Sequence, residues 1–305
     1  MNILAIISPL IFVGLIGFIT SKYDWFSKSQ VDSLAKFTFN LSIPAFLFQQ
    51  LANADLSNID LSVYGAFYAP VLIVYCLAWC INYYFHQQHN HDQTASASYA
   101  LGASYSNNVI VGLPVSLMVL GEEVLPVVFL VVSLHSALLF GITSFLSVKG
   151  KTFRWSIFFR QTLCNPLIIA ISAGFMINLM AVTLPQILND CLLLLGKPAI
   201  TLALFLLGAS LAYYRIRSEI KFIICASVLK LMVLPALVFI STRYIFEFNS
   251  LIITTLVILS ASPTGVNAYL IVKQHEKHQQ TVAGSIVVST LISIVTIPVW
   301  LLLLP

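Results

Sequence analysis

The chain has 305 residues, of which 59% are hydrophobic and only 9% are charged. Soluble globular domains carry about 25% charged residues, so this composition excludes an ordinary soluble domain and predicts an all-α, polytopic membrane protein. The net charge of +4 does not indicate nucleic-acid binding, because the basic residues lie in short segments between apolar runs, where they report membrane topology.

Apolar runs long enough to cross a lipid bilayer recur along the whole chain. At about 20 apolar residues per span, the sequence predicts ten transmembrane helices. Their expected ranges are residues 3–20, 34–51, 61–85, 95–120, 124–148, 157–182, 188–214, 220–245, 251–272 and 281–304. The first run has no basic leader before it and has Lys22 and Lys28 after it, which favours a retained first span over a cleaved signal peptide.

The distribution of basic residues predicts the orientation in the membrane. An even number of spans places both termini on one side, and most of the basic residues fall on one set of alternating loops. These are Lys22, Lys28, Lys36, Lys149, Lys151, Arg154, Arg160, Arg215, Arg217, Lys221, Lys273 and Lys277. The opposite set holds Arg243, with Lys197 near a span end. We therefore expect a protein of the cytoplasmic (inner) membrane with both termini outside the cytoplasm.

The two halves of the chain carry matching features. Pro9 in the first span corresponds to Pro166 in the sixth, and Pro70 in the third to Pro235 in the eighth. Since each half holds five spans, the second copy enters the membrane from the opposite face, which predicts two inverted repeats. The first repeat is expected at residues 1–148, a cytoplasmic linker at 149–156 and the second repeat at 157–305.

The fourth and ninth spans contain polar and helix-breaking residues at a depth where each unpaired backbone group costs several kcal/mol. These are Asn107, Asn108, Gly112 and Pro114 in the fourth span, and Ser262, Pro263, Thr264, Gly265 and Asn267 in the ninth. We expect glycine and proline to open both helices, and the two discontinuous helices to face each other and form a substrate site. The alternative is that the polar side chains only satisfy backbone groups freed at kinks.

Two titratable residues lie deep in predicted spans. Lys230 is about 16 Å into the eighth span, near the centre of the bilayer, where an ammonium must be paired, deprotonated or used. Lys230 could attract an anionic substrate, or it could reach a water-filled crevice. The alternative that we prefer is that it bonds the loose carbonyls of the broken helices in place of a sodium ion. His135, midway along the fifth span, could couple transport to protons or could be a hydrogen-bonded packing residue.

Five motifs in this order resemble the auxin efflux carrier family, which includes bacterial permeases and plant PIN-type proteins. They are Asn-Asn-Val-Ile-Val-Gly-Leu-Pro at 107–114, Leu-Ser-Ile-Pro-Ala at 41–45, Leu-Ala-Leu-Phe-Leu-Leu-Gly at 202–208, Lys-Leu-Met-Val-Leu-Pro at 230–235, and a run from Ala-Ser-Pro at 261–263 through Ser289-Thr290 to Pro298. The resemblance covers nearly the full chain.

The resemblance implies ten spans in an inverted repeat with crossed discontinuous helices 4 and 9. It also implies a scaffold of spans 1, 2, 6 and 7 beside a moving transport unit of spans 3–5 and 8–10, as in an elevator. The plant Asn-Pro-Asn signature is absent, because Asn108 follows Asn107 and the ninth span reads Ser-Pro-Thr-Gly. Auxin is therefore not carried over as the substrate, and the implied class is malate, malonate and similar carboxylates.

The leading hypothesis is a secondary active transporter that moves a small organic anion by alternating access, with H⁺ favoured over Na⁺ as coupling ion. A passive anion channel is the first alternative, and a membrane sensor or enzyme the second. The sequence contains no phosphate-binding loop and no catalytic constellation, so neither an enzyme nor a cofactor or metal is expected. The oligomeric state is left open, with a homodimer as one alternative.

Overall fold

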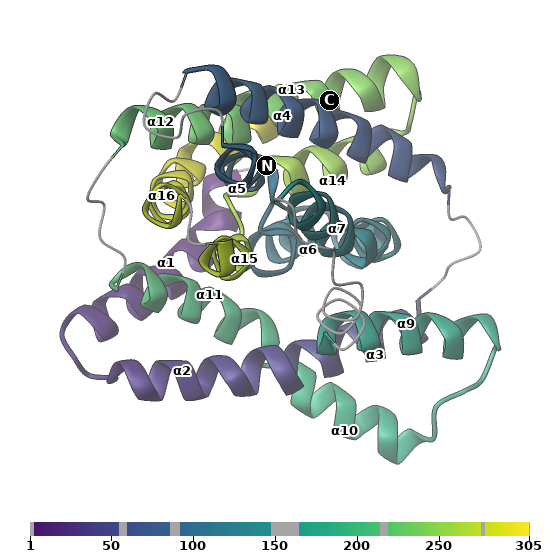
Figure 1. Ribbon diagram of the computed structural model, residues 1–305. Helices are drawn as coiled ribbons and strands as arrows, with labels where there is room; N and C mark the ends of the chain where they lie inside the picture. The colour runs from purple at the N-terminus through teal and green to yellow at the C-terminus, as the bar shows by residue number, and fades with distance from the viewer. Residues whose placement is uncertain are drawn as a thin grey trace.

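The computed structural model describes residues 3–54, 60–85, 92–147, 165–213, 219–275 and 278–304. All longer elements in these ranges are helices, which confirms the predicted all-α class (Figure 1). The α-helices are α1 (Ile3–Lys22), α2 (Lys28–Phe37), α3 (Ile43–Ala52), α4 (Ser62–Phe85), α5 (Gln93–Ser104), α6 (Leu113–Leu120), α7 (Leu125–Leu146), α9 (Pro166–Leu179), α10 (Gln186–Gly196), α11 (Ala199–Leu211), α12 (Ile220–Val228), α13 (Leu234–Ile240), α14 (Ser250–Ala261), α15 (Val266–His275) and α16 (Gln279–Leu303). The predicted linker at 149–156 lies outside the described residues.

Helix length and composition support several membrane crossings. Within the described ranges, Ser62–Phe85, Glu122–Leu146, Gln186–Leu211, Ile220–Ile245 and Gln279–Leu303 are long and apolar enough to cross a membrane. They match the third, fifth, seventh, eighth and tenth predicted spans. Shorter apolar helices at Ile7–Lys22, Asn108–Leu120, Pro166–Leu179 and Ser250–Ala261 match parts of the first, fourth, sixth and ninth. The fourth and ninth are shorter because each is interrupted.

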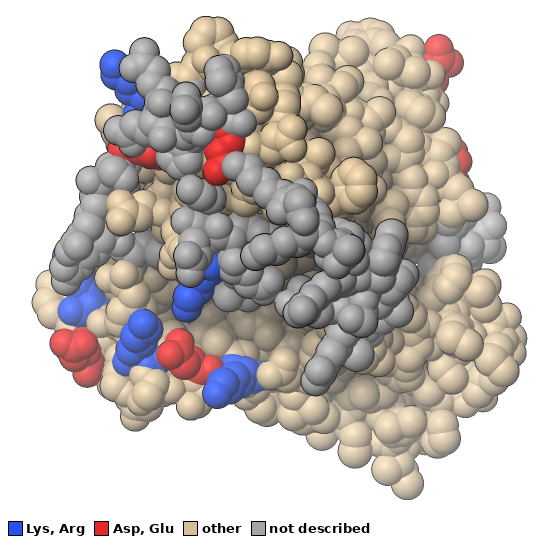
Figure 2. All heavy atoms as spheres, viewed as in Figure 1, with Lys and Arg blue, Asp and Glu red and all other residues tan. Residues whose placement is uncertain are grey.

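The helix of the second predicted span begins before its apolar run. It starts at Lys28 rather than at residue 34, because Ser27 and Gln30 form a capping box that satisfies the first backbone N–H groups. From there α2, the π-helical turn η1 (Thr38–Ser42) and α3 continue as one helix. On the face in Figure 2, charged side chains gather mainly at the lower left, over α2 and the adjoining loop.

The helices pack in two groups (Figure 1). In one group α1 lies along α11, and α3 lies along α9 and α10. In the other, α4 lies along α5, α12 along α16, and α13 along α14. The groups meet where α1 contacts α6 and α16, and where α7 contacts α3 and α9.

Glycine permits the close approach of α1 and α11. A methyl group on Gly208 of α11 would lie 1.7 Å from the Gly14 carbonyl oxygen, and one on Gly17 would lie 2.0 Å from the Phe205 carbonyl oxygen. No side chain fits at these distances, so the two backbones pack in direct contact. Small residues serve this purpose in membrane helices, where van der Waals packing drives helix association.

Three helices with proline as their second residue follow a π-helical turn. The turns η1, η3 (Asn108–Gly112) and η5 (Leu229–Val233) precede Pro44, Pro114 and Pro235. Proline has no N–H to bond the carbonyl four residues back, so the preceding residue bonds the carbonyl five back instead. In η5 the carbonyl that Pro235 leaves free, that of Leu231, accepts the indole N–H of Trp300 at 2.9 Å.

A chain of polar contacts ties one end of the second group together. The Asn82 amide N–H donates to His278 Nε2 at 2.9 Å, and Ser96 Oγ donates to Asn82 Oδ1 at 3.2 Å. With its proton on Nδ1, His278 donates to Thr281 Oγ1 at 3.0 Å, and the Thr281 hydroxyl donates to the Glu219 carboxylate. These contacts join α4, α5, the start of α12 and the start of α16, which come from both halves of the chain.

Candidate functional site

The two predicted interruptions lie side by side and bond each other through their backbones. In the fourth span α5 ends at Ser104, and in the ninth α14 ends at Ala261. Ser106 and Thr264 then form an antiparallel bridge. The Asn107 N–H donates to the Pro263 carbonyl at 2.8 Å, and the Gly265 N–H donates to the Tyr105 carbonyl at 3.0 Å. Two backbone donors that would be unpaired in an apolar medium are thus satisfied.

Side chains satisfy further backbone groups at the bridge. The Thr264 N–H donates to Ser289 Oγ at 3.0 Å, and the Thr264 hydroxyl donates to the Gly102 carbonyl at 2.9 Å. A methyl group on Gly265 would lie 2.5 Å from the Tyr105 ring, so only glycine fits there. The bridge is therefore fixed from both spans and from α16.

Lys230 lies in η5 and is fully buried, with 0% of its surface exposed. Its ammonium donates to the Ser260 carbonyl at 2.5 Å, near the end of α14. This contact is the one expected if Lys230 bonds a loose carbonyl of the ninth span. The contact lies near the C-terminal end of α14, where the backbone dipole favours a cation.

His135 of α7 supports the first interruption. Its Nε2 accepts the Ser106 N–H at 3.0 Å, so the proton of the neutral ring is on Nδ1. Nδ1 is buried and has no hydrogen-bond partner. The ring packs against Phe67, Tyr68 and Tyr105, with centroid distances of 6.1, 6.1 and 4.7 Å. His135 is thus a packed, hydrogen-bonded residue with one unused donor.

Buried polar atoms without a partner gather around the first interruption. They are Ser106 Oγ, Asn107 Nδ2, both side-chain polar atoms of Asn108, and His135 Nδ1. An unsatisfied buried polar atom costs about 1–3 kcal/mol. Several such atoms in one place make this the candidate site for a polar ligand or an ordered water.

These residues line a small cavity between the two helix groups. Tyr105, Ser106, Asn107, Asn108, His135, Ser136, Gly265, Val266 and Asn267 form its walls from the second group, and Phe39 and Leu167 close it from the first. Its volume is about 30 Å³. That is roughly the space of one water molecule, so any larger solute requires the two groups to separate. Among the residues that the structure describes, no carboxylate, lysine or arginine lines the cavity.

The predicted site residues divide into three sets. Asn107, Asn108, Asn267 and His135 line the cavity. Thr264 and Lys230 support the bridge by hydrogen bonds. Ser262 does not face the cavity, since its hydroxyl donates to the Ile258 carbonyl of its own helix at 3.0 Å.

The expectation that Gly112 and Pro114 open the fourth span is wrong. The interruption lies earlier, at residues 105–107, and Pro114 lies inside the continuous η3–α6 helix, where its missing N–H is accommodated by the π-helical turn η3. Gly112 has a packing role instead, because a methyl group there would lie 2.8 Å from a Leu259 methyl carbon and 2.9 Å from Ser262 Oγ. The expectation holds better in the ninth span, where Pro263 and Gly265 lie in the interruption itself.

Sequence reasoning missed Tyr105 and Ser136, and it counted Ser106 in the polar stretch of the fourth span without naming it as a site residue. The Tyr105 hydroxyl and Ser136 Oγ share a hydrogen bond of 2.7 Å at the cavity wall. Ser106 directly precedes the Asn-Asn pair and could have been included on that ground. Nothing in the sequence marks Ser136, which comes from α7 and reaches the site only through tertiary packing.

The chain is similar to known transporters over nearly its full length. The sequence profile of the "Membrane transport protein" family matches residues 3–150 and 149–301. An "Uncharacterized transporter" of Methanothermobacter thermautotrophicus is 24% identical over 298 residues, covering 97% of this chain and 96% of the relative. A "Putative malonate transporter" of Rhizobium meliloti is 24% identical over 302 residues, covering 94% and 91%. The "Uncharacterized transporter YfdV" of Escherichia coli is 22% identical over 310 residues, covering 96% and 95%.

The family match confirms the resemblance to auxin efflux carriers seen in the sequence motifs. It agrees with the apolar helices, several of which are long enough to cross a bilayer. The chain belongs to the membrane transport protein family and is a membrane transporter, not an enzyme.

Proposed function

We propose that this protein is a secondary active transporter for a small organic anion, with a carboxylate such as malonate or malate as substrate. The observation that carries the proposal is the cluster of unpartnered buried polar atoms beside two mutually bonded helix interruptions. The family membership and the name of the Rhizobium meliloti relative support the substrate class.

The site would recognise the anion mainly by hydrogen bonds. Asn107, Asn108 and Ser106 supply amide and hydroxyl donors, and a carboxylate accepts several such bonds at once. The helices that begin at Asn108 and Val266 start beside the cavity, and the positive ends of their dipoles favour a negative charge. The nearby Lys230 ammonium compensates part of that charge in place of a bound sodium ion.

The transport cycle would move the two helix groups relative to each other. In this proposal the chain has ten spans in two inverted repeats, with crossed discontinuous helices 4 and 9. Spans 1, 2, 6 and 7 form the scaffold and the remaining spans form the transport unit. The packing of α1–α3 with α9–α11 supports this division. So does the 30 Å³ cavity between the groups, because a carboxylate can enter only after Phe39 and Leu167 move away.

His135 would link transport to protons. Its Nδ1 carries an unused donor at the cavity, and its Nε2 holds the interruption through the Ser106 N–H. Protonation of Nε2 would remove this acceptor and change the shape of the binding loop. We place the protein in the cytoplasmic membrane with both termini outside, from the distribution of basic residues.

Uptake into proteoliposomes tests the proposal. Radiolabelled malonate should enter vesicles containing the purified chain with saturable kinetics, and unlabelled malonate inside should accelerate entry by counterflow. Uptake that is linear in concentration, without counterflow, would identify a passive channel and refute a carrier. A thermal-shift screen of mono- and dicarboxylates selects the substrate, since a binder raises the apparent melting temperature.

The roles of Lys230 and His135 are tested in the same vesicles. We expect Lys230→Ala to abolish uptake with or without a pH gradient, and His135→Ala to retain exchange but lose acceleration by the gradient. Lys221→Ala, at an exposed lysine in the same span as Lys230, is the control. If both site variants transport like wild type with the same pH dependence, these assignments fail.

A further inference from the structure

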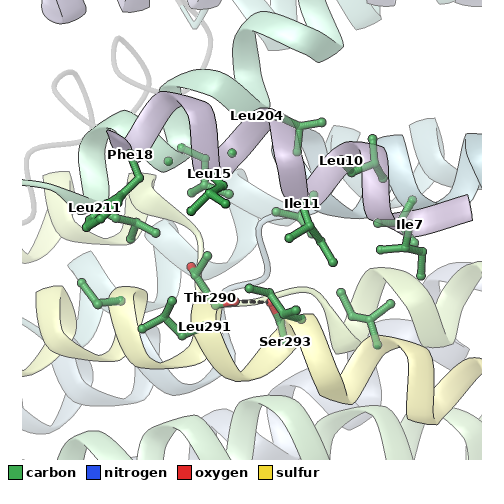
Figure 3. A pocket seen from close by; sticks show the side chains of 18 residues that line it. Ile7, Leu10, Ile11, Leu15, Phe18, Leu204, Leu211, Thr290, Leu291 and Ser293 are labelled. Carbon is green, nitrogen blue, oxygen red and sulfur yellow. Dashed lines mark hydrogen bonds between the residues drawn. The ribbon is translucent and has the colours of Figure 1, made fainter. Parts of the chain in front are cut away.

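A large apolar cavity lies apart from the candidate site, along the seam between the two helix groups. Its volume is about 450 Å³, and its walls come from α1 and α11 on one side and from α16 and the η3–α6 helix on the other. In Figure 3, Ile11 and Leu15 of α1 lie opposite Thr290 and Ser293 on α16. We refer to this cavity as the seam groove.

The chemistry of the seam groove excludes an organic anion. Within the described part of the chain, Thr290 and Ser293 are the only lining residues with polar side chains. Both hydroxyls donate to carbonyls of their own helix, at 2.6 and 2.7 Å. A carboxylate placed there would lose its hydration and gain no hydrogen bond, which costs many kcal/mol. An apolar ligand has no charge to dehydrate and does not incur this free-energy cost.

The seam groove opens onto the part of the surface that would face lipid. Phe12 and Ile16 on α1 are 61% and 53% exposed, and Leu291 and Val295 on α16 are 56% and 64% exposed. These residues continue the apolar lining outwards. A hydrocarbon chain can therefore enter from the side without crossing a polar surface.

The length of the seam groove matches one leaflet of a bilayer. Its lining on α1 runs from Ile7 to Phe18, which corresponds to about 16 Å at 1.5 Å per residue. Half of a hydrocarbon core of about 30 Å is about 15 Å. The groove is therefore as long as the space that one acyl chain occupies in its leaflet.

One end of the seam groove carries positive charge at a membrane interface. The Lys22 ammonium lies 5.6 Å from the centroid of the Phe18 ring, which lines the groove, and the Lys28 ammonium lies 6.0 Å from that of Tyr213, two residues after the groove residue Leu211. Exposed aromatic side chains between the two lysines, Tyr23 and Trp25, are typical of the headgroup level of a bilayer. Asp24, Asp32 and Lys36 lie in the same segment, which leaves it with a net positive charge.

We propose that the seam groove binds one acyl chain of an anionic phospholipid, such as phosphatidylglycerol, whose phosphate is held by Lys22 and Lys28. The groove supplies an apolar slot of one-leaflet length, and the lysines supply the complementary charge at its interfacial end. The bound lipid lies between the two helix groups. Its occupancy therefore affects how closely the groups can approach each other.

Native mass spectrometry of the detergent-purified protein tests this inference. The protein is titrated with phosphatidylglycerol and with phosphatidylcholine of the same acyl chains, and bound lipids are counted. We expect one phosphatidylglycerol to be retained in clear preference to phosphatidylcholine. Lys22→Gln and Lys28→Gln should each weaken its binding by about fivefold, since a basic residue at the membrane surface contributes about this factor. Lys221→Gln, a control at an exposed lysine on α12, should leave binding unchanged.

A second variant tests the acyl slot. Leu15 lines the groove and is 46% exposed, so Leu15→Trp can fill the slot with little strain on the core. We expect it to abolish retention of both lipids. Phe12→Trp, on the same helix but outside the lining, is the matched control. Circular dichroism melting verifies that all variants are folded. Retention of phosphatidylglycerol by Leu15→Trp at the wild-type level overturns the proposal, and so does equal binding of the two lipids.

Discussion

Asn108 and Asn82 form a matched pair that tests the reading of the site. Both are buried, with 3% and 1% of their surface exposed. Both side-chain polar atoms of Asn108 lack a partner, whereas Asn82 bonds His278 and Ser96. If Asn108 is kept for a ligand, its replacement by leucine should stabilise the empty protein and destroy its function. The same change at Asn82 should destabilise it.

The magnitudes follow from the hydrogen bonds. Two unsatisfied atoms cost about 1–3 kcal/mol each, and imperfect packing of leucine offsets part of the gain, so Asn108→Leu should stabilise by about 1–3 kcal/mol. For a chain of this size the apparent melting temperature should rise by about 2–6 °C. Asn82→Leu leaves His278 Nε2 without its donor and should lower the melting temperature by a similar amount.

The assay combines melting in detergent with malonate uptake into proteoliposomes. A hydrogen bond to a charged group contributes about 1.5–3 kcal/mol, so Asn108→Leu should lower kcat/KM for uptake by about 10- to 100-fold. In Asn82→Leu, uptake should fall only in proportion to the fraction of the protein that is unfolded. An Asn108→Leu variant that melts several degrees below wild type and retains uptake would refute a ligand-binding role for Asn108.

Three further variants probe the packing. Gly208→Ala places a methyl group against the Gly14 carbonyl and should separate α1 from α11. We expect the melting temperature to fall by at least 5 °C. A melting curve like that of the wild type would contradict the close contact. Trp300→Phe leaves the Leu231 carbonyl unpaired and should cost about 1–3 kcal/mol, measured by denaturant or thermal unfolding, with no change in substrate affinity. Gly265→Ala should disrupt the bridge and reduce both stability and uptake; unchanged uptake would show that the bridge is dispensable.

Much of the fold could be predicted from the sequence because apolar length and glycine or proline placement act locally. The apolar runs at residues 61–85 and 281–304 became α4 and α16 with ends shifted by no more than two residues. The exact position of a helix interruption could not be predicted in this way, because it depends on contacts with distant parts of the chain. Residues 105–107 contain no strong helix breaker, and they leave the helix because residues 262–265 offer them backbone partners.

The candidate site could be located from sequence but not resolved into roles. The depth of Lys230 in its span predicted a buried ammonium, yet its acceptor, Ser260, lies thirty positions away on another helix. Thr264 was expected to bind substrate, whereas its hydroxyl donates to the carbonyl of Gly102, 162 positions away in the sequence. Polar side chains of the same type can thus line the cavity or hold the backbone by hydrogen bonds. Long-range contacts decide between these roles, and composition and spacing do not reveal such contacts.

The polar chain from Asn82 through His278 and Thr281 to Glu219 has a mechanical consequence. It fastens helices of the first and second halves to one another at a single end of their group, in addition to the apolar packing there. We therefore expect this corner of the group to stay closed when the two helix groups move relative to each other. Spin labels attached at Tyr84 and Lys221, beside the corner, should accordingly keep one narrow separation in every conformation that the protein visits.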